Sequence, residues 1–260
     1  MKLREPRGTS PGSTADRVVH ALVDHIRRHK LTAGAALPSE IQTSAQLDIS
    51  RGIVREAYRS LSGAGIVHIV NGSSPRVGRI TNRALTQVLQ HAVSTQQATA
   101  AQVLELRGPL EECAAELAAA KRSLEDVAEL REAVAIMRAA KGRNDRYVKA
   151  DIRFHEIIGR ATGNPLFWLI GSALRESMDV SIRVSLAGRA SQDEIDAVID
   201  THEAIVDAIE KGDAPDARRL MRRHSEEART SVQRQVAAQP AGPDRPAAVR
   251  RRSRRAIPSS

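Results

Sequence analysis

Residues 37–80 read LPSEIQTSAQLDISRGIVREAYRSLSGAGIVHIVNGSSPRVGRI, and this stretch decides the fold of the first third of the chain. The tripeptide PSE at 38–40 is typical of a helix start, because proline fixes the backbone and serine can cap free N–H groups. We expect this helix to run to about Leu47. After a short turn, Ser50 is placed to cap a further helix that reaches about Ala64.

Two strands and an upstream helix complete this unit. The β-branched run at 65–70 and the segment 76–80 flank Asn71-Gly72, a strong hairpin-turn signal. Upstream, apolar residues recur at helical spacing from Thr14, a candidate N-cap, to about Lys30. The order of helix, helix, turn, helix and hairpin predicts a winged helix-turn-helix over residues 14–80.

The remaining chain predicts a mostly α protein. From residue 83 to 236 there is no further strand signal, and breaks separate six or seven helices, so we expect an all-α helical bundle over residues 81–238. The breaks lie near 94–98, 123, 142–144, 163–165, 188–191 and 212–215. Residues 1–13 are rich in Pro, Gly, Ser and Thr, and residues 239–260 in Pro, Ala and Arg. We expect both segments to be disordered, the second as a basic tail.

Charge and composition narrow the class of protein. The net charge is +9, and residues 1–80 carry 12 Lys and Arg against 6 Asp and Glu. A basic domain beside a nearly neutral body favours phosphate binding, while only 2% aromatic residues argue against a stacking platform for single strands. No apolar run is long enough to span a membrane. A lone cysteine, Cys113, fits a reducing cytoplasm.

The third helix of the winged unit carries the best candidates for reading DNA. The first turns of a recognition helix must offer hydrogen-bond donors to base edges and phosphates. The Arg51 guanidinium can donate two hydrogen bonds to one guanine. The start of the preceding helix can meet a phosphate, and the small wing tip suits the minor groove. An arginine row is otherwise often a solvated helix face. The DNA-binding candidates are Ser39, Ser50, Arg51, Arg55, Asn71 and Gly72.

The helical region contains a candidate metal site. Asp151 and His155 are four residues apart, so they share one helix face, and His202 and His224 lie on two later predicted helices. Three imidazoles and a carboxylate suit Zn²⁺, or Ni²⁺, Co²⁺ or Mn²⁺. The spacing alone does not make the four converge. A surface pair or satisfied core histidines are the alternative reading.

The N-terminal pattern resembles the GntR family of bacterial regulators. The resemblance rests on LPSE at 37–40, ISR at 49–51, VREA at 54–57 and GIV at 65–67. It implies operator contacts at Ser50, Arg51, Arg55 and the wing-tip Gly72. Two positions depart from the family pattern, Ile41 in place of arginine and Gly52 in place of Thr or Ser, so no relative's operator sequence can be transferred.

Residues 100–230 are similar to the helical FCD ligand-binding domain of the FadR subgroup. The matching pieces include ELR at 105–107, DIRFH at 151–155, TGNP at 162–165 and HEAI at 202–205. The resemblance implies that Asp151, His155, His202 and His224 bind a divalent metal on which a ligand sits. It also implies that Arg107 faces the ligand, where a guanidinium can hold a carboxylate by two hydrogen bonds.

These features predict a transcriptional regulator that acts as a repressor, and not an enzyme. A small carboxylate effector would bind at the metal site and change how a homodimer holds a palindromic double-stranded DNA operator. A metal-dependent hydrolase is one alternative, since Glu156 and Glu203 follow two of the candidate ligands. A DNA-binding protein without a ligand is the other, and the basic tail would suit it.

Overall fold

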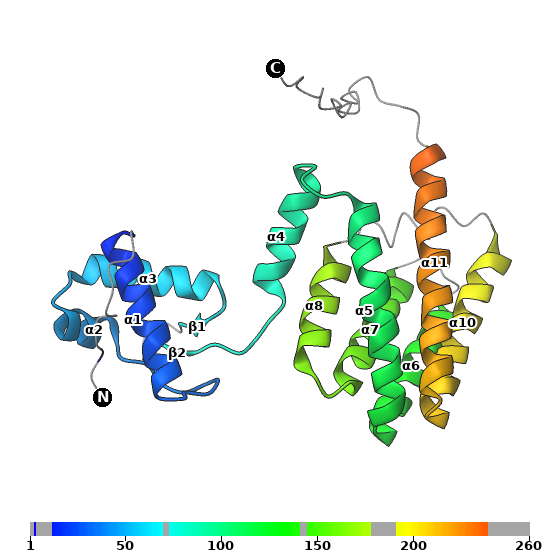
Figure 1. Cartoon of the computed structure of the whole chain (residues 1–260), viewed down its shortest axis with the longest axis horizontal. Coiled ribbons are helices and arrows are strands. Elements are labelled where there is room, and N and C mark those ends of the chain that lie inside the picture. The colour runs from blue at the N-terminus through cyan, green and yellow to red at the C-terminus, as the bar shows by residue number, and fades with distance from the viewer. Residues whose placement is uncertain (1–2, 4–11, 70–72, 141–144, 178–190, 239–260) are drawn as a thin grey trace, which may run out of the picture.

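A computed structural model describes residue 3 and residues 12–69, 73–140, 145–177 and 191–238. Within these ranges it has a small N-terminal unit and a larger helical bundle, joined by an extended segment that leads into helix α4 (Figure 1). The small unit contains α1 (Thr14–Arg28), α2 (Glu40–Leu47), α3 (Arg51–Gly63), β1 (Val67–His68) and β2 (Arg76–Val77). This is the predicted winged helix-turn-helix.

Serine caps fix the starts of α1 and α2, whereas Ser50, predicted to cap α3, occupies the N-cap position without a side-chain hydrogen bond, so that prediction was wrong. Ser39 caps α2 and forms a reciprocal capping box with Gln42, as the sequence predicts for this position. The cap of α1 is Ser13, with Asp16 completing the box. The prediction of Thr14 as the cap was therefore wrong by one residue, because Ser13 adopts the extended backbone that a cap needs.

The hairpin has shorter strands than predicted. The register pairs Val67 with Val77, and the regular ladder covers two residues of each strand. The pairing continues irregularly, since the Gly78 N–H donates to the Ile66 carbonyl oxygen and Ala36 forms an isolated bridge with Arg76. The segment before α2 thus lies on the other side of β2. The turn predicted at Asn71-Gly72 lies outside the described residues.

A compact core holds the small unit together. Val18 and Leu22 of α1 pack with Val54 and Leu61 of α3, and all four are almost fully buried. Leu3, from the segment predicted to be a disordered leader, is also buried in this core, and its N–H donates to the Gln46 side chain. The disorder predicted for the rest of that segment and for residues 239–260 concerns residues that the structure does not describe.

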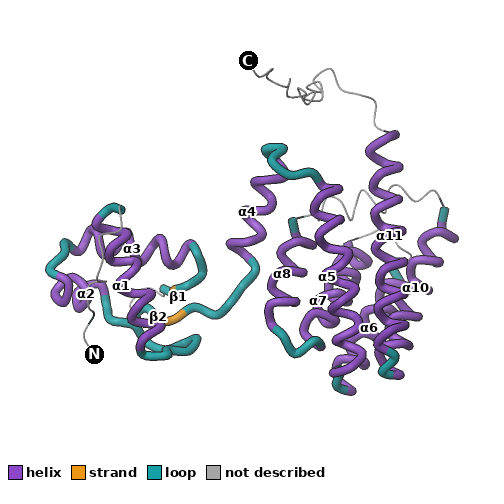
Figure 2. The backbone as a smooth tube through the Cα atoms, in the orientation of Figure 1, coloured by secondary structure: helices purple, strands orange, loops and turns teal. Residues whose placement is uncertain are grey.

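The rest of the described chain is helical (Figure 2). The helices are α4 (Arg83–Ser94), α5 (Ala100–Lys121), α6 (Leu124–Ala139), α7 (Asp145–Ala161), α8 (Pro165–Glu176), α10 (Gln192–Lys211) and α11 (Ala214–Ala238). They agree with the predicted breaks wherever the structure describes the break. Alanine and branched aliphatic side chains fill most of the core, with Phe154 and Tyr147 as its aromatic members.

Four helices surround the position where the metal was predicted. Helix α7 packs against both α6 and α5, and α11 packs along both α5 and α10. Gly108 of α5 faces Ser225 of α11, and a Cβ added at position 108 would make an ordinary van der Waals contact, 3.8 Å from the Ser225 Cβ. Close helix packing therefore brings side chains of α5, α7, α10 and α11 to one place in the bundle.

Helix α4 is tied to the bundle. The Asn82 side-chain amide donates to the Glu176 carboxylate on α8 at 2.6 Å. Leu89 and Val93 pack against a small cluster that includes Leu174 of α8. In the described part of the chain, none of the helices has the length and apolar character that a membrane span requires.

The close contact between Gly78 and Gly65 gives a test of the hairpin. A Cβ at position 78 would lie 2.2 Å from the Gly65 carbonyl oxygen, so we expect Gly78→Ala to lower the stability of the winged unit by about 1–3 kcal/mol. Gly52→Ala is the matched control, since nothing lies within 4 Å of its added Cβ. Amide hydrogen exchange followed by mass spectrometry over residues 14–80 measures both variants. Equal protection in the two would contradict the close approach of Gly78 to Gly65.

Candidate metal and effector site

The four predicted metal ligands converge in the helical bundle. Asp151 and His155 project from α7, His202 from α10 and His224 from α11. One ligand-type atom from each lies within 4.8 Å of the others, and all four residues are buried. Ligands about 2.1 Å from one ion are at most about 4.2 Å apart. The 4.8 Å spread exceeds this limit, so the cluster has to contract to fill one coordination shell.

The contact between His202 and Asp151 is the most informative one at this site. His202 Nδ1 lies 2.7 Å from the Val198 carbonyl oxygen, which can only accept, so Nδ1 carries the proton. In a neutral ring, Nε2 then presents a lone pair, and it lies 3.2 Å from Asp151 Oδ1. Two acceptors at that separation repel each other unless a cation or a further proton lies between them. The backbone bond also fixes the ring orientation, as it does for many metal-bound histidines.

The other two histidines have ring nitrogens without partners. Within the described residues, both nitrogens of His155 and Nδ1 of His224 are buried and make no hydrogen bond. Burial lowers the pKa of both imidazoles well below the ordinary value, helped by Arg175 for His155 and by His202 for His224. Phe154 packs edge-on against His155 and His202 with ring centroids 5.2 and 4.8 Å away. The site thus offers neutral nitrogen donors that are shielded from water.

Sequence reasoning missed Arg175, which organises the carboxylates of the site. Its guanidinium donates to Asp151 Oδ2 at 2.8 Å and to Glu111 Oε1 at 2.6 Å, and its side chain is 2% exposed. Burial would raise the pKa of Asp151, but the Arg175 guanidinium outweighs it and holds that pKa well below the ordinary value. Arg175 leaves Oδ1 facing the histidines. No spacing links α8 to α7 in the sequence, so no local pattern could have identified it.

Arg107, predicted from the resemblance to contact an effector, lies in the same buried cluster. Its Nε is 3.4 Å from Glu111 Oε1, without hydrogen-bond geometry, and the residue is 4% exposed. Glu111 Oε2 also has no hydrogen-bond partner within the described residues. Burial raises the pKa of Glu111, but Arg107 and Arg175 more than offset this, and the pKa is lowered. Two cations and two anions therefore share the cluster with three imidazoles.

A small cavity of about 20 Å³ adjoins the cluster. Glu111, His155 and Arg175 line it, together with Trp168 and Ser172 of α8. A space of this size holds about one water molecule. The approach to the histidines on this side therefore runs along α8, and a larger guest needs α8 or its neighbours to move.

The predicted DNA-reading residues cluster at one end of α3. Ser50, Arg51 and Arg55 are all exposed, and the Ser50 side chain makes no capping bond. Arg55 Nε is 3.1 Å from a Glu40 carboxylate oxygen on α2, so part of its charge is already compensated. Ser39 uses its hydroxyl to cap α2. Asn71 and Gly72, the remaining two candidates, lie outside the described residues.

This architecture defines a DNA-binding transcription factor with a second, helical domain. Residues 14–77 match the family model described as bacterial regulatory proteins, gntR family, and residues 102–227 match the FCD domain. A transcriptional repressor, NanR of Salmonella newport, is 30% identical over 213 residues, which are 81% of this chain and 82% of that protein. NanR of Cronobacter sakazakii is 29% identical over the same length.

The chain therefore belongs to the GntR family, and its FCD domain places it in the FadR subgroup. Among solved structures, Streptococcus agalactiae GntR aligns with a TM-score of 0.62 at 22% identity. The alignment covers 84% of this chain and 99% of that one. This likeness confirms the fold. The protein is a DNA-binding transcriptional regulator, as the sequence predicted.

The placement of Arg175 gives a stability test. Arg175→Met leaves the Asp151 and Glu111 carboxylates buried without their guanidinium, so we expect a loss of about 3–5 kcal/mol in metal-free protein. Arg153→Met is the control, because Arg153 is 52% exposed in a surface pair with Glu129, where the loss should be about 0–1 kcal/mol. Urea unfolding followed by the fluorescence of Trp168, the sole tryptophan, measures both. Losses of the same size would remove the structural role assigned to Arg175.

Proposed function

We propose that this protein is a metal-dependent repressor whose operator binding is controlled by a small carboxylate. In this proposal a divalent ion, Zn²⁺ in the first place with Ni²⁺, Co²⁺ or Mn²⁺ as alternatives, binds Asp151, His155, His202 and His224. The effector completes the coordination of that ion and contacts Arg107. The observation that carries the proposal is the approach of His202 Nε2 to Asp151 Oδ1, two acceptors 3.2 Å apart at the centre of the cluster.

The donor set supports a borderline metal such as zinc. Three imidazole nitrogens and one carboxylate oxygen are ligands that Zn²⁺ shares with Ni²⁺, Co²⁺ and Mn²⁺. The buried nitrogens without partners fit this role, because an unpaired buried polar atom is otherwise costly. When bound, the ion supplies a strong positive centre to which an anionic oxygen can bind.

Charge balance supports an anionic effector. Arg107 and Arg175 offset Glu111 and Asp151, so the cluster without an ion is close to neutral. A divalent ion adds two positive charges in a buried place, where uncompensated charge is unfavourable. A carboxylate on the ion and on Arg107 would offset one of these two charges. The effector class that fits is a small hydroxy acid, sugar acid or similar compound.

The control of DNA binding follows from the two-domain construction. We propose that two copies bind a palindromic operator through the first turns of α3, and that effector binding moves α8 and neighbouring helices. Helix α4 would transmit this change, since Asn82 at its start is bonded to Glu176 at the end of α8. We propose that operator binding represses transcription, because the relatives are described as repressors.

We propose that the site binds its ligand without turning it over. Glu203, one candidate base, faces outward and forms an exposed ion pair with Arg138. Glu156 lines the small cavity, and burial and Glu176 raise its pKa. Turnover of a carboxylate by the wild type that is lost on His155→Ala would contradict this part of the proposal.

Metal content is the direct test of the ligand set. We expect about one divalent ion per chain in the wild-type protein by elemental analysis after incubation with zinc and gel filtration. His155→Ala with His224→Ala should lose that ion, because two of the four donors are gone. His20→Ala with His91→Ala is the control, since both histidines are exposed and far along the chain from the cluster. A wild type without metal would overturn the site.

The same variants test the effector. Small carboxylates should change operator binding by the wild type and by the control, and should leave the His155→Ala/His224→Ala protein unaffected. If carboxylates still change operator binding by the His155→Ala/His224→Ala protein, effector binding does not depend on the metal and this part of the proposal is wrong.

The DNA-reading role of Arg51 is tested on an operator selected from random duplexes with the wild-type protein. Arg51→Ala should weaken binding to this operator by about 1–3 kcal/mol, because a bidentate base contact is lost, and should relax the preference at one base pair. Arg27→Ala removes the same charge from α1, where the side chain is 79% exposed and paired with Asp24. Fluorescence anisotropy at fixed salt measures both. Equal losses would leave Arg51 without a reading role.

A further inference from the structure

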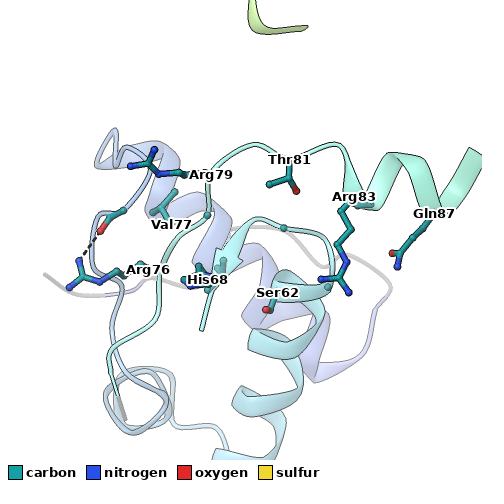
Figure 3. Close-up of a pocket in the computed structure, with 14 residues that line it drawn as sticks. Ser62, His68, Arg76, Val77, Arg79, Thr81, Arg83 and Gln87 are labelled. Carbon is teal, nitrogen blue, oxygen red and sulfur yellow. Dashed lines mark hydrogen bonds between the residues drawn. The ribbon is translucent and has the colours of Figure 1, made fainter. Parts of the chain in front are cut away.

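A second pocket lies at the base of the wing, where the small unit joins α4. Its volume is about 780 Å³, within the range of about 300–1,000 Å³ typical of ligand sites. The hairpin forms one side, the C-terminal end of α3 forms the floor, and the start of α4 forms the other side. Figure 3 shows Arg76 and Arg79 on the hairpin side and Arg83 extending from α4 toward Ser62 of α3.

The pocket is strongly basic. Arg76, Arg79, Arg83 and His68 line it, and no aspartate or glutamate is among the described residues around it. Ser62, Thr81 and Gln87 add hydroxyl and amide groups that can donate hydrogen bonds. The lining thus combines hydrogen-bond donors with positive charge and contains no acid among its described residues, although Figure 3 shows Arg76 and Arg79 extending away from Arg83.

Two arginines of this pocket lack the acidic partners that several exposed arginines elsewhere in the described chain have, a property that they share with Arg51, Arg59 and Arg146. Arg131 and Arg138 on α6 each pair with two acidic side chains of α10. Arg79 and Arg83, by contrast, have no ion pair with any residue that the structure describes. Arg76 donates to the Gly34 carbonyl oxygen at 2.8 Å, a bond that orients the guanidinium but does not compensate its charge. Two or three cations are therefore left to attract an external anion.

We propose that this pocket binds a phosphate-type anion, carried by a phosphorylated small molecule or by the DNA backbone. Guanidinium groups match phosphate oxygens with paired, charge-assisted hydrogen bonds, and Arg83 with the Ser62 hydroxyl offers such donors in the pocket. A lone phosphate would fill a small part of the volume, so a larger phosphorylated compound fits better. This site is independent of the metal cluster.

The position of the pocket separates it from the DNA-reading end of α3. Ser62 and Gly63 lie at the C-terminal end of that helix, whereas Arg51 starts it. At 1.5 Å per residue, the two ends are roughly 18 Å apart. An anion held by Arg83 and by the hairpin would also cross-link α4 to the small unit. It would thereby restrict how the winged unit is held relative to the bundle.

The test uses full-length protein and inorganic pyrophosphate as the probe. Isothermal titration at low ionic strength compares the wild type with Arg79→Gln/Arg83→Gln, where we expect affinity to fall on the order of tenfold or more. The control is Arg146→Gln/Lys149→Gln, which removes the same charge from exposed positions on α7. The pocket variant keeps the metal cluster, so binding that disappears in it cannot belong to that cluster. Circular dichroism verifies that both variants remain folded.

Competition with a random-sequence DNA duplex distinguishes the two sources of phosphate. If pyrophosphate binds and the duplex does not compete, the pocket serves a free phosphorylated ligand. If the duplex competes, and the pocket variant shows a weaker salt dependence of DNA binding than the control, the DNA backbone is the source. Two results would overturn the proposal: no pyrophosphate binding together with unchanged DNA binding in the pocket variant, or equal losses in the control.

Discussion

The helical domain depends on how one buried carboxylate is shared. Asp151 gives one oxygen to the Arg175 guanidinium and leaves the other 3.2 Å from His202 Nε2. Burying a charge is costly unless it is paired, so α8 must stay against α7 to keep Arg175 in place. The same constraint aims Oδ1 at the imidazoles. The stability of the bundle and the geometry of its ligand cluster thus rest on the same interaction.

The cluster also connects five helices, because Arg175 of α8 belongs to it together with residues of four others. Asp151 and His155 come from α7, His202 from α10, His224 from α11, and Glu111 and Arg107 from α5. A ligand that changes the spacing of any two of these groups acts on the whole bundle, because packed interiors shift in steps and do not deform smoothly. Helix α8 has one outward connection, through Glu176 to Asn82 of α4, and residues of α5 also pack in the cluster that α4 contacts. A site in the bundle can in this way affect the segment that leads to the winged unit.

The two candidate sites use charge in opposite ways. In the bundle, buried arginines and carboxylates compensate each other's charge. The neutral histidines provide ring nitrogens that make no hydrogen bond and could bind a metal. At the base of the wing, exposed arginines face a pocket whose described lining lacks acids. The cluster in the bundle fits a metal cation to which an anionic effector then binds. The pocket at the base of the wing fits an anion without a metal. Because the pocket lies between the hairpin and α4, a guest there would act on the joint between the two domains.

The sequence by itself determined the order of elements and the identity of the four candidate ligands. Proline, serine and glycine signals fix helix ends locally, and helical spacing puts Asp151 and His155 on one face, so both follow from short stretches of chain. The sequence-based prediction put the N-cap of α1 one residue too late and made the two strands too long, because caps and strand pairing depend on the detailed backbone geometry. Only the tertiary structure decided that His202 and His224 meet that face, that Arg175 and Glu111 belong to the cluster, and that Arg79 and Arg83 line a basic pocket. Those contacts join residues tens of positions apart, and no local periodicity carries information about packing between distant helices.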